Sequence, residues 1–338
     1  MPGKRSAEIC PVAAGLHASD TVALNAVEFR GAVIDVGTNS VKLLVADVRD
    51  QAVTPFLETS EQTRLGAGFY DSHQLQPERI DHTARVVSRF ATQARELGAV
   101  RVRVIATSAA REAKNGADLR TALDAASGVV TEVISGEQEA DWGFAGVVSN
   151  PVFAGRPLMI LDVGGGSTEV ILGCSGPRAV RPDFRQSFPL GSVRYLERFR
   201  CGTAPTAADL ASVRAALAEY LRREVRGALE RAKAPLGVTQ AVGIGGTTAI
   251  LALIHHRCLQ FEREFIEATE FSAPALTELV ERLWSLPLDE RRKLPGLPPE
   301  RADVILFGAA IYEAILREFR LTTLAISLRG LRYAALLT

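Results

Sequence analysis

The segment Ile34-Asp35-Val36-Gly37-Thr38-Asn39-Ser40 returns later in the chain as Leu161-Asp162-Val163-Gly164-Gly165-Gly166-Ser167. Both copies read D-V-G-x-x-S and lie between two apolar runs, which predicts two β-hairpins, over residues 31–48 and 158–173. Turns of this kind leave backbone N–H groups free, and glycine lets a phosphate approach the backbone closely. One copy in each half of the chain therefore predicts two similar domains that face each other across a phosphate-sized cleft.

The composition is that of an ordinary globular protein. The 338 residues suffice for two domains, and 47% are hydrophobic and 23% charged. Lys+Arg and Asp+Glu both number 39, so net charge predicts neither a nucleic-acid nor a membrane partner. No apolar run approaches the roughly 18 residues of a transmembrane helix. An anionic ligand would therefore have to be held by local arrangement.

The cysteines and the N-terminus bear on the compartment. Cys10, Cys174, Cys201 and Cys258 are scattered without a C-x-x-C pair, which argues against a disulfide framework or a zinc site. Residues 11–16 are short and contain a glycine, which is unlike a signal-peptide core. We therefore expect a cytoplasmic enzyme with a loosely ordered N-terminal extension over residues 1–28.

The remaining segments alternate strand and helix patterns. In the first half we expect a helix over 77–97, a strand over 102–106 leading into a helix at Thr107, and a strand over 129–134 leading into a helix up to about Val148, with Ser135 as its N-cap. In the second half we expect a helix over 207–233, a strand over 241–244, a helix to His256, a helix from Pro298 and Pro299 to Phe319, and a strand over 324–327. This alternation predicts an α/β fold with mixed sheets. We assign 29–142 to domain I and 143–338 to domain II, and leave the last helix free to pack back on domain I.

Three turns rich in Gly, Ser and Thr follow apolar strands. One such turn is often no more than a tight turn, but three, two of them internally repeated, favour a phosphate cradle. The candidates for phosphate binding are Thr38, Asn39, Ser40, Gly165, Gly166, Ser167, Thr168, Gly245, Gly246 and Thr247, with Gly191 and Ser192 between the second and third turns.

Acidic residues end two of these apolar strands. An unpaired carboxylate at Asp35 or Asp162 would be costly to desolvate. A divalent cation shared with phosphate oxygens would explain both, and ligation by oxygen alone suits Mg²⁺. The alternative is that each Asp only caps its own turn. Glu169 closes the second turn and points either into the cleft or away from it.

Glu139 and Arg111 are the candidates for catalysis. Glu139 is placed to orient and deprotonate water, although an acid in a first helical turn also satisfies the helix dipole. Arg111 follows a strand directly, where a guanidinium can hold two oxygens of one phosphate; taken alone, it also fits a solvated helix face. No G-x-x-x-x-G-K-[ST] motif, no G-x-S-x-G motif and no cysteine-nucleophile motif is present.

Taken in order, these segments resemble the exopolyphosphatase / guanosine pentaphosphate phosphatase (Ppx/GppA) family, in its short two-domain form, over about residues 30–335. The matching strings lie at 34–40, 106–111, 135–140, 162–169, 245–248 and 301–303. The Asp-x-Gly-Gly-Gly-Ser-Thr-Glu and Ser-Gly-x-x-Glu-Ala strings separate this family from the kinases of its superfamily, which includes actin, sugar kinases and Hsp70.

The resemblance implies two ribonuclease H-like (actin/Hsp70-type) domains with mixed sheets flanking an interdomain cleft. It implies that Glu139 activates water, that Arg111 and the two hairpin turns hold the phosphates, and that Asp162 and Glu169 help bind Mg²⁺, or Mn²⁺ in its place. Asp35 is the third metal candidate. The implied reaction is hydrolysis of the terminal phosphoanhydride bond of inorganic polyphosphate. The same reaction on guanosine pentaphosphate and a non-catalytic sensor remain alternatives, an ATP-dependent kinase is disfavoured because the Glu139 string is typical of the hydrolases, and a homodimer is left open.

The chain departs from the family pattern at two places. Gln138 replaces the first of two adjacent Glu residues, and residues 327–334 read S-L-R-G-L-R-Y-A where the family has S-D-x-G-L-R-E-G. The loss of two acids and a glycine there puts substrate contacts at that edge in doubt. Arg178, Arg181, Arg185 and Arg194 favour a long polyanion, although they also fit a solvated surface.

Overall fold

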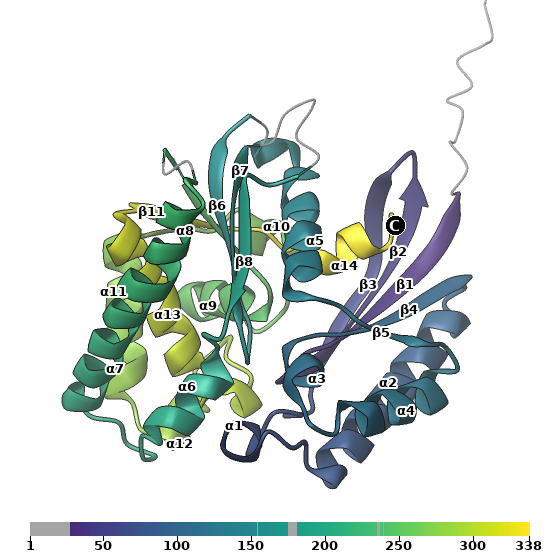
Figure 1. Cartoon of the computed structure of the whole chain (residues 1–338), viewed down its shortest axis with the longest axis horizontal. Coiled ribbons are helices and arrows are strands. Elements are labelled where there is room, and N and C mark those ends of the chain that lie inside the picture. Colours follow the sequence, from purple (N-terminus) through teal and green to yellow (C-terminus); the bar gives the residue numbers. More distant parts are fainter. Residues whose placement is uncertain (1–27, 154, 175–180, 235–236, 239) are drawn as a thin grey trace, which may run out of the picture.

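The computed structural model describes residues 28–153, 155–174, 181–234, 237–238 and 240–338 (Figure 1). The expected extension over residues 1–28 lies outside the described residues except for Glu28. None of the helices in these described ranges is long and apolar enough to cross a membrane.

The first sheet is built on the first predicted hairpin. Its strand order is β3-β2-β1-β4-β5. The strands are β1 (Phe29–Val36), β2 (Ser40–Arg49), β3 (Ala52–Gln62), β4 (Arg101–Ala106) and β5 (Thr131–Val133). The first three are antiparallel neighbours, whereas β4 and β5 run parallel to β1. The core strand β1 is buried from Gly31 to Val36, because the sheet carries helices on one face and a crossing helix on the other.

The second sheet repeats this plan with one extra strand. Its order is β10-β11-β9-β6-β7-β8. The strands are β6 (Pro157–Val163), β7 (Thr168–Cys174), β8 (Phe184–Phe188), β9 (Gln240–Ile244), β10 (Glu270–Ser272) and β11 (Thr323–Ile326). Strands β6, β7 and β8 are antiparallel neighbours, while β9 is parallel to β6 and β11 is parallel to β9. The two predicted hairpins therefore lie in different sheets with the same topology.

Helices cover both sheets. We call the part built on β1–β5 the first half and the part built on β6–β11 the second half. Helices of the first half are α1 (Phe69–Ser72), α2 (Pro77–Glu96), α3 (Ser108–Glu112) and α4 (Gly116–Ser127). Helices of the second half are α6 (Ser192–Phe199), α7 (Ala207–Tyr220), α8 (Gly227–Arg231), α9 (Gly246–His256), α10 (Arg263–Glu267), α11 (Ala273–Ser285), α12 (Leu288–Arg291) and α13 (Ile305–Phe319), with 3-10 turns at Pro151–Phe153 and Pro299–Arg301.

Two helices cross between the halves (Figure 1). Helix α5 (Gly136–Val148) follows the first sheet in sequence, yet it packs Ala140, Phe144 and Val147 on the second sheet. Helix α14 (Leu331–Ala335) follows the second sheet, yet it packs on the first. The domain boundary expected after residue 142 thus falls inside a helix that contacts both sheets.

The predicted helix limits differ from the structure at two places. A π-helical turn (Leu221–Arg226) interrupts the helix expected over 207–233, and the helix ends at Arg231. The last long helix begins at Ile305, not at Pro298, because Pro299–Arg301 form a short 3-10 turn, and Arg301 and Asp303 bond to the first half. The predicted N-cap is confirmed, since the hydroxyl of Ser135 accepts from the backbone N–H of Gln138 at 3.1 Å.

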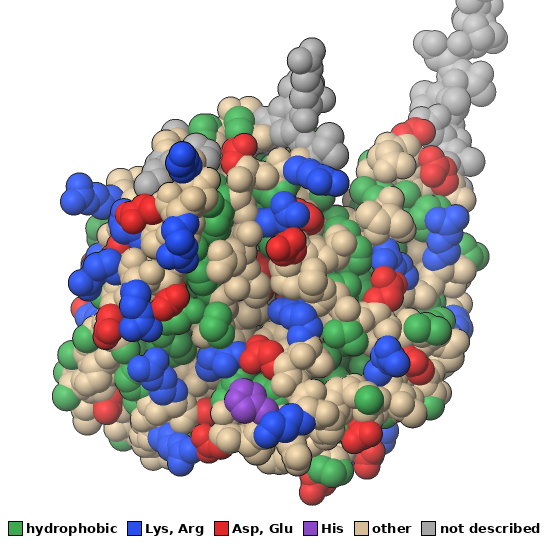
Figure 2. Space-filling view, viewed as in Figure 1, with side chains coloured by type: hydrophobic (Ala, Val, Ile, Leu, Met, Phe, Trp, Pro, Cys, Tyr) green, Lys and Arg blue, Asp and Glu red, His purple; other side chains and the backbone are tan. Residues whose placement is uncertain are grey.

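Charged side chains are mixed over the face in Figure 2. Lys and Arg alternate with Asp and Glu, and the described residues form no extended patch of one sign on that face. This agrees with the equal counts of 39 basic and 39 acidic residues.

Candidate active site

The two repeated turns meet at a small cavity of about 50 Å³. Most of the sequence-predicted site residues line it: Asp35, Thr38, Asn39, Ser40, Glu139, Asp162, Gly165, Gly166, Ser167, Glu169, Gly246 and Thr247. These residues come from the ends of β1 and β6, from the turns that follow them, from the starts of β2 and β7, from α5 and from the start of α9. Segments distant in sequence therefore converge because the two sheets face each other with their turns in contact.

Three candidates support the second turn from behind and do not line the cavity. The hydroxyl of Thr168 donates to the carbonyl of Leu190. The backbone N–H of Ser192 donates to the carbonyl of Gly164 at 3.0 Å. A Cβ on Gly191 would lie 2.3 Å from the carbonyl oxygen of Gly165, so a side chain there would displace the turn. Gly245 lines the neighbouring cavity instead.

The glycines of the second turn let the two halves touch. A Cβ on Gly165 would lie 3.0 Å from Cβ of Thr38. A Cβ on Gly166 would lie 2.4 Å from the hydroxyl of Ser108 and 2.5 Å from that of Tyr70. Backbone of one half thus meets hydroxyl groups of the other, which requires residues without side chains.

Glu139 is a buried carboxyl group at the edge of the cavity, with 8% of its surface exposed. The Nη1 of Arg111 donates to Oε2 of Glu139 at 2.7 Å and to the carbonyl of Ile134 at 3.1 Å. Arg111 therefore points inward at the site, not along a solvated helix face. Burial raises the pKa of Glu139 to about 7; Arg111 opposes this rise, and the carboxylates of Asp162 and Asp35 add to it. A carboxyl group with a pKa near neutrality suits general base catalysis.

The other three acids of the site, Asp35, Asp162 and Glu169, differ in how closely a positive charge approaches them. Lys42 Nζ lies 3.6 Å from Asp35 Oδ2. Burial raises the pKa of Asp162, with Lys42 opposing and Asp35 adding to the rise. Glu169 lines the cavity, where Ser167 and Ser187 donate hydroxyl bonds to its Oε1 at 2.9 and 2.6 Å. Burial raises the pKa of Glu169 well above its ordinary value, and the charges of Glu139 and Asp162 raise it further.

This donor set fits a Mg²⁺ ion that shares its ligands with substrate. In the described part of the chain, no three His, Cys, Asp or Glu side chains gather closely enough to hold a metal ion by themselves. Mg²⁺ commonly takes only one or two carboxylates and completes its shell with phosphate oxygens and water. Asp162 and Glu169 are direct cross-strand partners. Burial is the main cause of their raised pKa values, and a bound cation would favour the ionised form of both carboxylates.

Arg301 is a site residue to which the sequence analysis gave no role. It is 8% exposed, and its Nη2 donates to the hydroxyl of Ser40 at 3.0 Å. Its Nε has no hydrogen-bond partner among the described residues, and burial lowers its pKa to about 10. A buried guanidinium with a free donor beside a phosphate-sized cavity is suited to an anion. The string at 301–303 matched the family, but one arginine in a proline-rich segment carries no sign of burial.

The arginines expected to line a polyanion track are differently placed. Arg185 pairs with Asp141 at 2.9 Å and with Glu137 at 3.6 Å. Arg194 pairs with Glu112 at 2.7 Å. Arg181 is exposed, and Arg178 lies outside the described residues. Of these four residues, the two that lie near the site already have carboxylate partners.

A larger cavity of about 520 Å³ adjoins the first and shares Lys42, Gly246 and Arg301 with it. One wall is apolar and includes Ala249, Ile250, Leu253, Leu259, Phe261, Leu294 and Leu297. The opposite wall comes from β3 and is polar, with Glu58, Thr59, Ser60 and Gln62. This shape suits a molecule with an apolar body and an anionic end.

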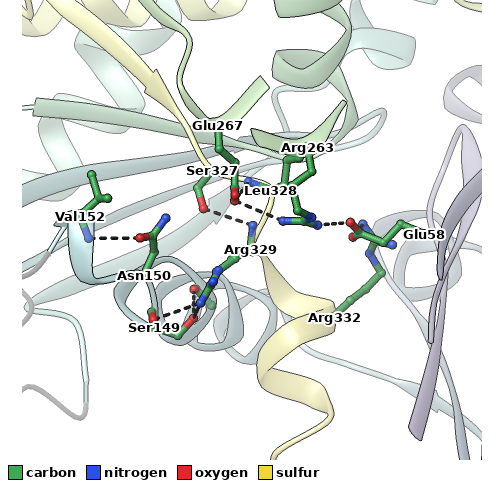
Figure 3. Close-up of polar contacts among 11 residues, drawn as sticks. Glu58, Ser149, Asn150, Val152, Arg263, Glu267, Ser327, Leu328, Arg329 and Arg332 are labelled. Carbon is green, nitrogen blue, oxygen red and sulfur yellow. Dashed lines mark hydrogen bonds and ion pairs between the residues drawn. The ribbon is translucent and has the colours of Figure 1, made fainter. Parts of the chain in front are cut away.

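Two residues of the altered segment 327–334, Leu328 and Arg332, line this larger cavity. Figure 3 shows the polar contacts around that segment. Glu58 lies between Arg263, to which it bonds, and Arg332 at 3.4 Å. The backbone N–H of Leu328 donates to Glu267 at 3.1 Å. The ring of Tyr333 lies 5.5 Å from the guanidinium of Arg263. Carboxylates from β3 and α10 therefore compensate the cations near a segment that has lost two acids of its own.

Comparison with known proteins agrees with this geometry. The sequence matches the Ppx/GppA phosphatase family over residues 44–337. It is 33% identical over 302 residues to exopolyphosphatase 2 of Mycobacterium tuberculosis, covering 86% of this chain and 91% of that protein. It is 28% identical over 306 residues to exopolyphosphatase 1 of Mycobacterium bovis, covering 90% and 86%.

Solved structures give the same result. An exopolyphosphatase from Cytophaga hutchinsonii superposes with a TM-score of 0.81 at 26% identity, covering 91% of this chain and 97% of that one. The Aquifex aeolicus PPX-GPPA enzyme superposes with a TM-score of 0.73 at 28% identity, covering 91% and 98%. The predicted fold class, two actin-like α/β domains with mixed sheets, is confirmed.

Proposed function

Because the chain belongs to the Ppx/GppA phosphatase family and is a hydrolase, we propose that it is a Mg²⁺-dependent exopolyphosphatase that releases phosphate from the end of inorganic polyphosphate. The observation that carries this proposal is Glu139. It is a buried carboxyl group with a pKa near 7, it is held by Arg111 at 2.7 Å, and it faces a cavity formed by both repeated turns.

The residues of the chain have distinct parts in this reaction. Backbone N–H groups and hydroxyls of the two turns bind the terminal phosphate, and Arg301 adds a buried positive charge. Arg111 binds Oε2 of Glu139, which leaves Oε1 to accept the proton of the attacking water. Mg²⁺ held by Asp162 and Glu169 would neutralise charge on the transferred phosphoryl group. Catalysis is then mainly positioning and charge stabilisation.

A substrate panel tests the proposal. The purified protein is incubated with long-chain polyphosphate, guanosine pentaphosphate and ATP, each with Mg²⁺ and with excess chelator, and released phosphate is measured. We expect release from polyphosphate that requires Mg²⁺. Release from none of the three would overturn the hydrolase assignment, and full activity in chelator would overturn the metal requirement.

Guanosine pentaphosphate is the second candidate, because the larger cavity has an apolar wall next to the phosphate site. Leu253→Trp would narrow that cavity at its apolar wall, away from the turns. The variant should lose guanosine pentaphosphate hydrolysis and keep polyphosphate hydrolysis if the cavity binds a nucleoside.

Salt dependence separates the two substrates further. Exposed contacts to a long polyanion weaken as the Debye length falls to about 10 Å at 0.1 M salt, so the KM for polyphosphate should rise with salt and fall with chain length. If guanosine pentaphosphate is far the better substrate and the preference survives high salt, the polyphosphate proposal is wrong.

A cytoplasmic location and a homodimer remain proposals from the sequence. Sedimentation equilibrium of the full chain would test the dimer directly, since a second copy would double the measured mass.

A further inference from the structure

Helix α6 belongs to the second half and lies next to α1 of the first half (Figure 1). Three residues at helical spacing, Arg194, Glu197 and Arg200, reach α1, α3 or the residue before α1. Glu197 accepts from the backbone N–H groups of Gly68 at 2.6 Å and Tyr70 at 3.0 Å. Arg200 pairs with Asp71, but both side chains are about 70% exposed, which makes that pair weak.

Arg194 is more enclosed than Arg200. Its Nη2 lies 2.8 and 2.7 Å from the two carboxylate oxygens of Glu112. Its Nε donates to the carbonyl of Gly166 at 2.9 Å. Its guanidinium also lies 4.1 Å from the centre of the Tyr70 ring. The side chains of Arg194 and Glu112 are 19% and 32% exposed, so this pair is better shielded from solvent than the pair at Arg200.

These contacts join two parts of the reaction machinery. Gly166 belongs to the second phosphate turn, and Glu112 is the last residue of α3. That short helix also carries Arg111, which holds Glu139, and Ser108, whose hydroxyl donates to Glu112 at 2.9 Å. Arg194 therefore connects the turn that binds phosphate to the helix that orients the base.

We propose that Arg194 is a positioning residue whose ion pair with Glu112 sets the distance between the second turn and the Arg111–Glu139 pair. Arg194 does not touch the substrate in this arrangement, in contrast to the phosphate-binding part expected from the sequence. Pulling the guanidinium onto a phosphate would leave Glu112 without its cation and Gly166 without its donor, which is costly in a shielded site. The inference rests on the proposed function, because it assigns Arg194 a part in the same hydrolysis.

A double-mutant cycle separates positioning from substrate binding. The variants are Arg194→Gln, Glu112→Gln and the two together, assayed for kcat and KM with polyphosphate and Mg²⁺. A misplacement of about 1 Å can cost about a hundredfold in rate, so each single variant should lower kcat at least about tenfold. The KM should change less than threefold, and the double variant should be no worse than either single variant.

Two further variants complete the design. Arg194→Lys keeps the charge but loses the two-pronged geometry, so it should fold and recover part of kcat. Arg198→Gln is the matched control, because Arg198 lies on the same helix, is exposed and contacts the rings of Tyr195 and Phe199 on that helix. It should behave as wild type.

A substrate-contact role for Arg194 predicts a different result. Glu112→Gln would then free the guanidinium, leaving kcat intact and lowering KM, while Arg194→Gln would raise KM. That pattern, or losses that multiply in the double variant, would overturn the proposal.

Hydrogen exchange of the substrate-free protein gives an independent readout. Amides of residues 164–168 should exchange faster in Arg194→Gln and in Glu112→Gln than in wild type. Unchanged exchange in both variants would contradict the proposal that the Arg194–Glu112 ion pair clamps the second turn. If wild-type protein releases no phosphate at all, the proposed function fails, while this exchange measurement still decides whether the clamp exists.

Discussion

The two repeated turns share a backbone hydrogen bond, from Gly37 to Ser40 and from Gly164 to Ser167, but differ in the charge pair across their strands. In the first hairpin, Asp35 is the cross-strand partner of Lys42. In the second, Asp162 is the cross-strand partner of Glu169. The position that supplies a cation in one hairpin thus supplies a second acid in the other.

This difference gives the two turns different needs for a bound cation. The Asp35 charge is already compensated by Lys42 at 3.6 Å, so the first turn does not need an added cation. The second turn holds two acids whose pKa values are raised by burial; Lys42 opposes the rise at Asp162, whereas the charges of Glu139 and Asp162 add to the rise at Glu169, so the second turn gains more from a bound cation. With Mg²⁺ bound as proposed, the first turn would supply the ammonium group of Lys42 to the phosphate site and the second turn would supply the acids, Asp162 and Glu169, that would hold the ion.

The largest expected effect is at Glu139, whose pKa is raised by the aspartates of both turns, Asp162 and Asp35. Glu139→Gln keeps size but removes the group that accepts the proton, so phosphate release should fall by about 10²–10⁴-fold. Polyphosphate binding, measured by filter retention or calorimetry, should be largely kept. Near wild-type turnover would show that the base lies elsewhere.

The second expected effect compares the two aspartates directly. Asp162→Asn should raise the Mg²⁺ concentration for half activity by at least about tenfold, because a neutral amide is a weaker ligand for a hard cation. Asp35→Asn should change that concentration much less. Equal shifts in both variants would mean that the two turns share the metal equally. That result would contradict the assignment of the metal to the second turn.

The third effect is on stability and has opposite signs at the two cross-strand positions. Lys42→Gln leaves the buried Asp35 without its cation and should destabilise the metal-free protein by about 1–3 kcal/mol. Glu169→Gln removes a buried carboxylate that lies beside Glu139 and Asp162, while its carbonyl still accepts from Ser167 and Ser187, and should raise the free energy of unfolding of the metal-free protein.

Denaturant unfolding in chelator at pH 8 measures both changes. Loss of stability in Glu169→Gln would show that this acid is not repelled in the folded state, and the contrast between the turns would then fail.

The smallest effects concern pH. Glu139 has a folded pKa of about 7, above the ordinary value of 4.5, so the folded state binds more protons than the unfolded state between these values. Stability of the metal-free protein should therefore fall as pH rises from about 4.5 through 7. Activity should rise over the upper part of this range, because only the ionised carboxylate accepts a proton.

Thermal melts from pH 5.5 to 8 with and without Mg²⁺ check the sign, with about 2–4 °C expected for each kcal/mol. Glu139→Gln serves as the control and should show a weaker pH dependence. A melting temperature that rises with pH in wild type would contradict the assignment.

Local patterns in the sequence predicted the elements that depend on local physics. The hairpins follow from apolar runs around glycine turns, and the cap at Ser135 follows from one hydroxyl and one nearby N–H. The cavity residues on the turns could be named because each lies directly after a buried strand. The π-helical turn at Leu221–Arg226 could not be predicted, because the pattern of Ala, Leu and Arg residues continues through it.

Contacts between distant segments could not be predicted from the sequence. The paired state of Arg194 depends on Glu112, 82 residues away, and the bond from Arg301 to Ser40 spans 261 residues. Nothing local distinguishes these arginines from exposed ones, because burial and pairing are set by which surfaces meet. The crossing of α5 and α14 likewise depends on Gly146, where a Cβ would lie 2.4 Å from the carbonyl oxygen of Gly330.

The sequence by itself determined the repeat, the strand-turn-strand units and the family, because these depend on hydrophobic periodicity and on the conformational freedom of glycine. Only the tertiary structure decided which acids lie side by side, which arginines keep a hydrogen-bond donor for a ligand and which helices cross between the sheets. The physical reason is that charge compensation acts across space, between side chains that packing brings within a few ångströms of each other, whatever their separation along the chain.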